Sequence, residues 1–339
     1  MSDPPGMNVA TAVAARVGPR WRSLDPLLPR PGLLPPGCGV PLIAAGADRE
    51  PAAVAACEHW HGEPGSLDLA WGAAHRFLLT ALVAGPRPAG GLDGLLSRWR
   101  DHLADVPDAE GEDTAAVVTW PSRDVAGVPA LLRHGLAPLA VLAARVTSRR
   151  AAAGGPVISN GPVRAGNIVF AGEVRAAVRI RRAGPGDVAV VVRLALETIR
   201  FDAHFAAVTE RPGTARALRA EAARALADRE PWIWLAEYAG GPAGMIWVQP
   251  PGTSSGIAPM TCLAPAAYIL LLSVAAPERG RGIGAALAAR AHRQIAAADV
   301  AVTLLHYALP SPLSAPFWAG QGYRPLWTQW HARPARTVR

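Results

Sequence analysis

The chain has 339 residues, of which half are apolar and 18% are charged, and this composition excludes a disordered chain, a collagen-like repeat and a disulfide scaffold. At about 100–200 residues per domain, the length predicts two domains. All 34 basic residues are arginine, so no lysine is available for a Schiff base with pyridoxal phosphate or for a phosphate-binding loop.

The N-terminal half is predicted to combine strands with one amphipathic helix. Strand patterns cover residues 40–45, 52–61, 76–83 and 115–120, and the helix is expected at residues 92–103.

A segment rich in Gly, Ala and Pro separates this half from the rest of the chain. Residues 149–177 show no sustained period, which is typical of a linker. We therefore predict a first domain at residues 1–150, a linker at 151–177 and a second domain at 178–339.

The sequence of residues 178–339 predicts an α/β (α+β) fold whose elements follow the order β-α-α-β-β-β-α-β-α-β. A strand at residues 178–182 leads through Gly184-Pro-Gly-Asp187 to a helix at 188–199, with Asp187 as its expected cap. The remaining elements are a helix at 214–228, strands at 232–238 and 243–248 joined as a hairpin, a strand at 267–275, a helix at 284–297, a strand at 300–307, a short helix at 316–320 and a strand at 325–332.

The end of this order is repeated in the N-terminal half. A shift of 187 residues places residues 135–139 over 322–326, and the strand at 115–120 over 302–307, without a gap. Both halves are therefore expected to share one architecture.

A glycine-rich loop lies between the strand at 267–275 and the helix at 284–297. Its sequence, Pro277-Glu-Arg-Gly-Arg-Gly-Ile-Gly284, brings backbone N–H groups, the helix dipole and two arginines together, which predicts a pyrophosphate site. A dinucleotide-binding pattern through Gly280, Gly282 and Ala285 fits less well, because its acidic residue, Asp299, precedes the next strand instead of ending it. A purely structural glycine turn is the remaining alternative.

The pattern Arg279-x-x-Gly282-x-Gly284, after a strand that ends Ser-Val-Ala-Ala-Pro, resembles the acetyl-CoA signature of the GNAT superfamily of N-acetyltransferases. Residues 316–323, Pro-Phe-Trp-Ala-Gly-Gln-Gly-Tyr, are similar to the later helix and Gly-aromatic turn of that family. The resemblance covers residues 178–332 and, in outline, 40–146. It implies two tandem GNAT folds, each a mixed central sheet flanked by helices, with a degenerate N-terminal copy, as in tandem members such as mycothiol synthase.

The same resemblance implies acetyl-CoA, or another acyl-CoA, as co-substrate. The residues expected to hold it are Ser273, Val274 and Ala275 in the strand, Arg279, Gly280, Arg281, Gly282, Ile283, Gly284 and Ala285 in the loop, and Ser311 and Trp318 near the later helix. The loop amides would bind the pyrophosphate, and the strand would pair with the pantetheine arm. The amide of Val274 is also expected to stabilise the thioester oxyanion.

Two positions depart from the family pattern. Members often have Asn where this chain has Ser311, and a proton-donating Tyr where it has Trp318, whose indole is not an acid at neutral pH. Since the strand at 268–272 offers no carboxylate, His306 is assigned as base and Tyr307 as acid. Adjacent strand residues face opposite sides, so at most one assignment is expected to hold unless the strand ends or bulges there, and a structural histidine is the alternative.

The expected acceptor site lies at the end of the helix at 188–199. Glu197, Asp202 and His204 could attract a cationic amine there, although a solvated helix end explains the same residues.

A possible metal cluster occurs in the strand at 52–61. Cys57, His59 and His61 alternate on one face, a spacing that could bind an ion, but no second cluster supports it and no metal is expected. The three cysteines lack C-x-x-C spacing and are expected to be reduced.

The N-terminal half is expected to be catalytically silent and to shape the acceptor site or the domain interface. At its matching strand-to-helix junction it has Gly85-Pro-Arg-Pro-Ala-Gly-Gly-Leu92, whose prolines remove amides that a phosphate would need.

Together these observations predict a cytoplasmic N-acyltransferase that acts by direct transfer on a small-molecule amine, with no nucleic acid or membrane partner.

Two alternatives to this function stay open. The departures at Ser311 and Trp318 favour a non-catalytic acyl-CoA-binding module. The charge of residues 151–339, +9 from 20 arginines against 11 acidic residues, leaves a nucleic-acid-binding protein possible, while residues 1–150 carry −1 from 14 against 15.

Overall fold

The structure is a computed structural model of the whole chain, and it describes residues 5–32, 40–45, 51–85, 87–147 and 178–339. The strands are β1 (Val40–Ala45), β2 (Pro51–His61), β3 (His75–Val83), β4 (Thr114–Pro121), β5 (Ala137–Val146), β6 (Arg179–Arg182), β7 (Ile233–Tyr238), β8 (Gly241–Gln249), β9 (Ala266–Val274), β10 (Val302–Ala308) and β11 (Arg324–Ala332). The helices are α1 (Pro5–Leu24), α2 (Pro88–Ala104), α3 (Val128–Arg133), α5 (Val188–Ala203), α6 (Thr214–Leu226), α7 (Ile283–Ala297) and α8 (Ser314–Gly320).

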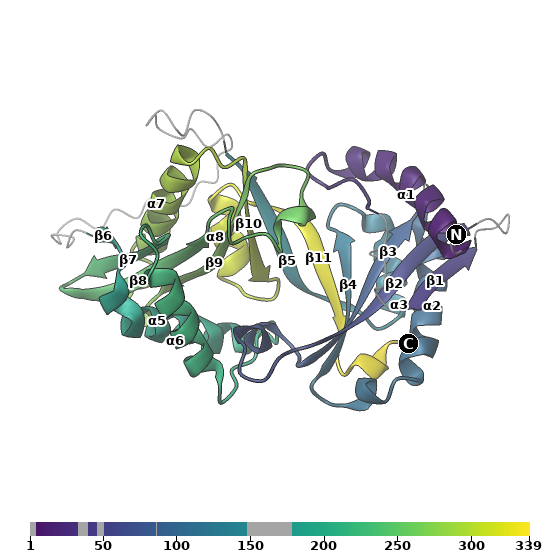
Figure 1. Cartoon of the computed structure of the whole chain (residues 1–339), viewed down its shortest axis with the longest axis horizontal. Helices are drawn as coiled ribbons and strands as arrows, with labels where there is room; N and C mark the ends of the chain where they lie inside the picture. The colour runs from purple at the N-terminus through teal and green to yellow at the C-terminus, as the bar shows by residue number, and fades with distance from the viewer. Residues whose placement is uncertain (1–4, 33–39, 46–50, 86, 148–177) are drawn as a thin grey trace.

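All of these strands belong to one mixed sheet that runs through the molecule (Figure 1). Its order is β1-β2-β3-β4-β11-β5-β10-β9-β8-β7-β6. The pairs β3–β4 and β9–β10 are parallel, and the other neighbours are antiparallel. The pairing types therefore follow the same order on both sides of the β11–β5 pair, which agrees with the sequence repeat, although β6 has no counterpart beyond β1 among the described residues.

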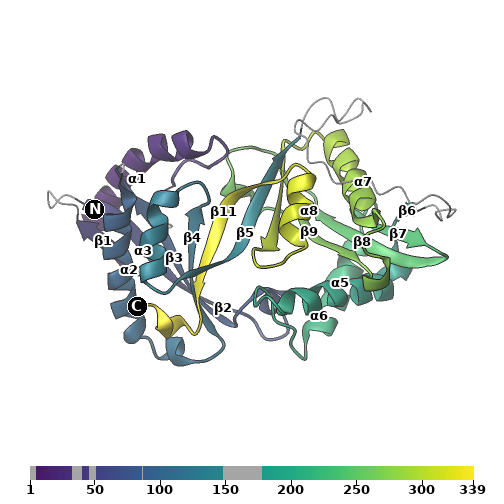
Figure 2. The ribbon, with the colours of Figure 1, turned by 180° about the vertical axis from the view of Figure 1, so that it is seen from behind.

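The two halves exchange their last strands. β5, from the N-terminal half, lies between β11 and β10, while β11, from the C-terminal end, lies between β4 and β5 (Figure 2). The central residues of β5, Val141–Ala144, are at most 2% exposed. The predicted linker at 151–177 lies outside the described residues, and the division into domains at that segment stays a prediction.

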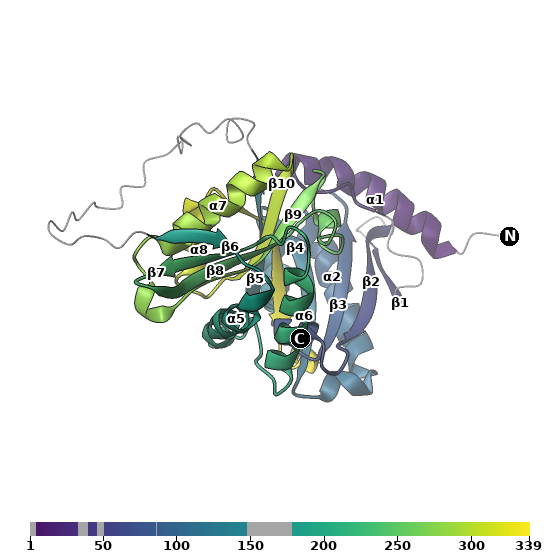
Figure 3. The ribbon, with the colours of Figure 1, turned by 60° about the vertical axis from the view of Figure 1, so that its left-hand side comes forward.

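Apolar helix faces cover both sides of the sheet. α2 and α3 bury Leu92, Leu96 and Leu131 against the N-terminal strands, and α1 packs on the opposite face. In the C-terminal half, α7 lies on one face and the pair α5 and α6 on the other (Figure 3). None of the helices in the described ranges is both long and apolar enough to cross a lipid bilayer.

One detail of the predicted local structure is wrong. Asp187 precedes α5, but its side chain makes no capping hydrogen bond to that helix. Its carboxylate instead accepts hydrogen bonds from the guanidinium of Arg181, at 2.7 and 2.8 Å, and from the N–H of Gly184 at 2.9 Å. The bidentate arginine contact occupies both oxygens, so Asp187 closes the turn between β6 and α5.

Candidate functional site

A divergence between two parallel strands creates the main cavity. β9 and β10 pair only from Ala266 and Val302 to Ile269 and Leu305. Beyond that point β9 stays paired with β8 and β10 stays paired with β5, so the facing edges separate. A cavity of about 1420 Å³ opens at the separation and is lined by residues 270–274 of β9 and 306–308 of β10.

The free edge of β9 offers backbone groups to this cavity. The N–H of Ala275 donates to the carbonyl of Ala243 on β8. Because alternate residues of an antiparallel strand bond to the same neighbour, Ser273 also directs its backbone toward β8, whereas Val274 directs its N–H into the gap. The N–H of Val274 thus faces the gap, whereas the backbone of Ser273 and Ala275 faces β8 and is not directed toward a pantetheine arm in the gap. Ser273 retains a buried hydroxyl with no hydrogen-bond partner among the described residues, beside the cavity.

The loop before α7 is open and its amides are free. Gly280 and Gly282 have φ angles of +78° and +82°, and a Cβ at either would meet nothing within 4 Å. No acceptor in the described part of the chain receives a hydrogen bond from the N–H groups of residues 280–285, whereas the next one, Ala286, donates to the carbonyl of Gly282. These amides and the positive end of the α7 dipole therefore have the chemistry that an anion site requires.

The two loop arginines are held by neighbouring groups. Nε of Arg279 donates to the carbonyl of Val274 at 3.0 Å, and its guanidinium lies over the ring of Phe201. Nε of Arg281 lies 3.0 Å from Glu278, and Arg281 does not line the cavity. Arg279 thus places its positive charge beside the loop, whereas Arg281 contributes only its backbone N–H to the set of free amides.

Comparisons with known proteins agree with this geometry. No family model and no curated protein matches the sequence. Among solved structures, a GCN5-related N-acetyltransferase from Sphaerobacter thermophilus is 15% identical with a TM-score of 0.55, and the match covers 98% of this chain and 94% of that one. The chain has the GNAT fold.

Two further similar structures carry the same family description. A GCN5-related N-acetyltransferase from Kribbella flavida is 13% identical, with a TM-score of 0.42 and coverage of 95% of this chain and 94% of that chain. A tandem GNAT protein from the clavulanic acid biosynthesis pathway is 14% identical, with a TM-score of 0.42 and coverage of 95% and 96%. The match with a TM-score of 0.55, which covers 98% of this chain, confirms the predicted fold class.

The two catalytic candidates of this GNAT fold occupy opposite faces of β10. Nδ1 of His306 lies 3.0 Å from the hydroxyl of Tyr268, while Tyr307 packs on the side of α7 and α8. Both line the cavity, because it extends through the gap between the strands. Burial lowers the pKa of His306 to about 4 and raises the pKa of Tyr307. His306 is therefore neutral at pH 7, as a proton acceptor must be.

Only one of the three acceptor candidates on α5 lines the cavity. Burial raises the pKa of Asp202 to about 6, against the opposing effect of Arg279. Glu197 lies outside the lining, where it accepts a 2.6 Å hydrogen bond from the N–H of Ala276. His204 is exposed at the end of α5, and its Nδ1 contacts the carbonyl of Arg200. The structure gives Glu197 a role in holding the loop, and it does not bring His204 to the site.

Of the two candidates near α8, only Trp318 lines the cavity. Trp318 lines the cavity and packs edge-on against Phe317 and Tyr323. Ser311 is 2% exposed, lies outside the lining and places its hydroxyl 3.1 Å from that of Ser314. Ser311 thus stabilises the turn before α8.

The N-terminal half supplies a wall that the sequence motifs did not reveal. Residues 65–68, Trp71 and Arg76 line the cavity, although they precede its other lining residues by more than sixty positions. Arg76 lies over the Trp60 ring and donates to the carbonyl of Asp68 at 2.8 Å. Burial, together with Arg333 and Arg211, lowers the pKa of Arg76 to about 10. The N-terminal half therefore brings Arg76 to one end of the cavity, where the charges of Arg211 and Arg333 from the C-terminal half act on it.

The matching junction in the N-terminal half is tightly packed at one of its glycines. A Cβ at Gly91, in the first turn of α2, would lie 2.9 Å from a methyl group of Val83, whereas a Cβ at Gly85 or Gly90 would meet nothing within 4 Å. Residues 85 and 87–92 do not line the cavity, and residue 86 lies outside the described part of the chain. The lack of a phosphate site in this copy stays a prediction.

Proposed function

We propose that the C-terminal half binds acetyl-CoA, or another short acyl-CoA, and transfers the acyl group directly to the amine of a small molecule. The observation that carries the proposal is the run of unpartnered N–H groups at residues 280–285, open to a cavity that continues through the gap between β9 and β10. A pyrophosphate requires such a set of donors, and an extended amide-bearing arm requires a free strand edge.

The co-substrate would supply an activated thioester. The amides of residues 280–285 would bind its pyrophosphate, with Arg279 adding positive charge. The N–H of Val274, directed into the gap, would stabilise negative charge on the carbonyl oxygen under attack. His306, neutral at pH 7, would accept the proton of the acceptor amine directly or through water, and Asp202 would attract the amine while it is still cationic.

Direct binding measurements test the first step with a matched pair of variants. Gly282→Asp places a carboxylate where the pyrophosphate would lie. Gly240→Asp adds the same side chain at the same φ, +82°, in the turn between β7 and β8, away from the cavity. Titration calorimetry with acetyl-CoA should show equal affinities for the native chain and Gly240→Asp, and at least tenfold weaker binding for Gly282→Asp. Equal binding by all three proteins, or binding by none, rejects the proposal.

A second assay separates an enzyme from a binding module. Transfer of the acyl group to an amine releases free thiol from acetyl-CoA, and so does hydrolysis, so release above the amine-free rate is measured across a panel of amines. Amines that also carry a carboxylate belong in the panel, because Arg76 lines one end of the cavity. Tight binding without thiol release for any amine would identify a non-catalytic acyl-CoA-binding module.

A further inference from the structure

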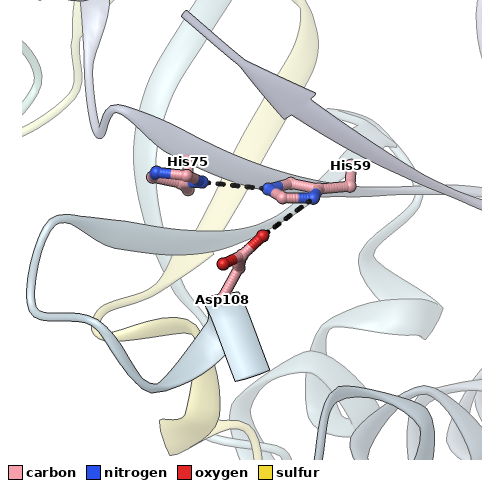
Figure 4. A group of neighbouring side chains, drawn as sticks. All are labelled: His59, His75 and Asp108. Atoms are coloured by element: carbon pink, nitrogen blue, oxygen red, sulfur yellow. Dashed lines mark hydrogen bonds and ion pairs between the residues drawn. The ribbon is translucent and has the colours of Figure 1, made fainter. Parts of the chain in front are cut away.

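A second cluster of chemically reactive side chains lies at the surface of the N-terminal half, outside the main cavity (Figure 4). His59 on β2, His75 on β3 and Asp108, in the turn after α2, meet there. One ligand atom from each of the three residues lies within 4.8 Å of the other two. The cluster joins three segments that are separated in sequence.

The imidazoles are already spaced as metal ligands. Nε2 of His59 lies 3.1 Å from Nδ1 of His75. Two nitrogens bound tetrahedrally to one ion at 2.0–2.1 Å are separated by roughly 3.3 Å, so small side-chain rotations would admit an ion between them. Oδ2 of Asp108 lies 3.9 Å from Nδ1 of His59, on the other side of that ring. A carboxylate in this position either orients the histidine or rotates in as a third ligand.

The surrounding structure holds these groups in place. The ring of His59 stacks on Phe77 with centroids 4.3 Å apart and an angle of 13° between planes. His75 is fixed at the start of β3, where its N–H donates to the carbonyl of Asp113. Ala109, next to Asp108, is fully buried. The cluster therefore rests on paired strands and an anchored turn, which lowers the entropic cost of assembling a site.

The residues that meet here differ from the alternation seen in the sequence. Cys57 is 6% exposed and packs in the core of the N-terminal half, and it is not among the three residues whose ligand atoms lie close together. Those three residues come from β2, β3 and the turn after α2.

We propose that His59, His75 and Asp108 bind one divalent transition-metal ion of the zinc type. Two imidazoles and a carboxylate suit Zn²⁺, Co²⁺ or Ni²⁺, whereas Mg²⁺ and Ca²⁺ prefer oxygen ligands only. The remaining coordination positions face solvent, because His59 and Asp108 are exposed. The ring of His61, 5.0 Å from that of His75, is the nearest further donor. This site is independent of the proposed acyl transfer.

Cobalt titration of the full-length, tag-free protein tests the site. Co²⁺ is added to metal-free protein, its visible absorption is followed, and Zn²⁺ is then used to displace it. One equivalent should bind, His59→Ala and His75→Ala should each weaken binding at least tenfold, and Asp108→Asn should weaken it by about 10- to 100-fold. His204→Ala removes an exposed histidine from the other half and should leave the affinity unchanged.

Thermal unfolding of each protein is recorded alongside the titrations, so that a loss of binding counts only in a folded variant. Equal affinity of the native chain and the double variant His59→Ala, His75→Ala would overturn the proposal. Failure of the native chain to bind Co²⁺ and Zn²⁺ would overturn it as well.

Discussion

The hydroxyl of Tyr268 lies 3.0 Å from Nδ1 of His306, and this contact joins β9 to β10 where the two strands begin to diverge. Burial raises the pKa of Tyr268, so its phenol stays neutral and can either donate a hydrogen bond to Nδ1 or accept one from Nδ1–H. Only the second arrangement leaves Nε2 unprotonated. The proposed role of His306 as a proton acceptor therefore requires the tautomer in which Nδ1 donates to Tyr268.

Replacing His306 tests this role. His306→Gln should lower kcat by about 10²- to 10³-fold and leave the affinity for acetyl-CoA unchanged, since a positioned base contributes in that range. Because burial lowers the pKa of His306 to about 4, the rate should rise with pH above 5 through deprotonation of the acceptor amine and not through His306. Tyr307→Phe, on the opposite face of β10, serves as the comparison. A His306→Gln variant within threefold of native kcat would contradict the assignment.

The proposed acceptor site gives Asp202 a role that pH-dependent kinetics can test. Its pKa of about 6 makes it a carboxylate above that pH and a neutral acid below it. We expect Asp202→Asn to raise the KM for the acceptor about tenfold at pH 7.5, and to abolish the rise in native KM on going from pH 7.5 to 5.5. Asp299→Asn, in the exposed turn after α7, provides the control. Equal KM values for native and Asp202→Asn protein at both pH values would exclude a charge interaction.

Periodicity and turn residues predicted most of the fold. The strand predicted at 40–45 matches β1, and the helix predicted at 284–297 differs from α7 by one residue. Helix α1 was missed, because Gly6, Gly18 and Pro19 interrupt a pattern whose buried face includes Val13 and Val17. Strand exchange could not be predicted, since it depends on which of two similar strands completes each half, and the repeat makes β5 and β11 alike.

In the candidate site, too, the features set by local sequence were predictable and those set by tertiary packing were not. The open loop at residues 280–285 was identifiable, because adjacent glycines and a helix start leave backbone N–H groups unpaired through local backbone geometry alone. Arg76 and the other lining residues of the N-terminal half reach the cavity only through tertiary packing, which no local pattern records. Glu197 was assigned to the acceptor because its charge is visible in the sequence, whereas its hydrogen bond to Ala276 is not.

Asp25 provides a test of stability. It is 1% exposed and accepts hydrogen bonds from the guanidinium of Arg324, on β11, and from the N–H of Leu27. Burial alone would raise its pKa, but these bonds and the charges of Arg324 and Arg123 lower it. Asp25→Asn should therefore reduce the free energy of unfolding by about 3 kcal/mol, as when a buried ion pair loses one partner.

The pH dependence of this contribution has a definite sign. A carboxyl whose folded pKa lies below its unfolded value of about 3.9 stabilises the protein above that pH, and the contribution is lost as pH falls through the folded pKa. Urea unfolding at pH 7 should thus separate native and Asp25→Asn protein, with the difference shrinking below pH 4. Asp101→Asn, in an exposed pair with Arg100, should change stability by less than about 0.5 kcal/mol. Equal effects of the two substitutions would show that burial of Asp25 is unimportant.

The exchange of β5 and β11 makes each half depend on the other. Cutting the chain within residues 151–177 and expressing 1–150 and 178–339 separately would remove β11 from β4 and β5 from β10, and would expose the buried centre of β5. We expect each fragment alone to aggregate or unfold, the two co-expressed fragments to purify as one complex, and the intact chain to unfold in a single calorimetric transition. The alternative is that each half pairs with its own last strand, since β5 and β11 are related by the repeat. Two soluble, monomeric fragments with cooperative unfolding would establish that alternative and show that the exchange is not required for folding.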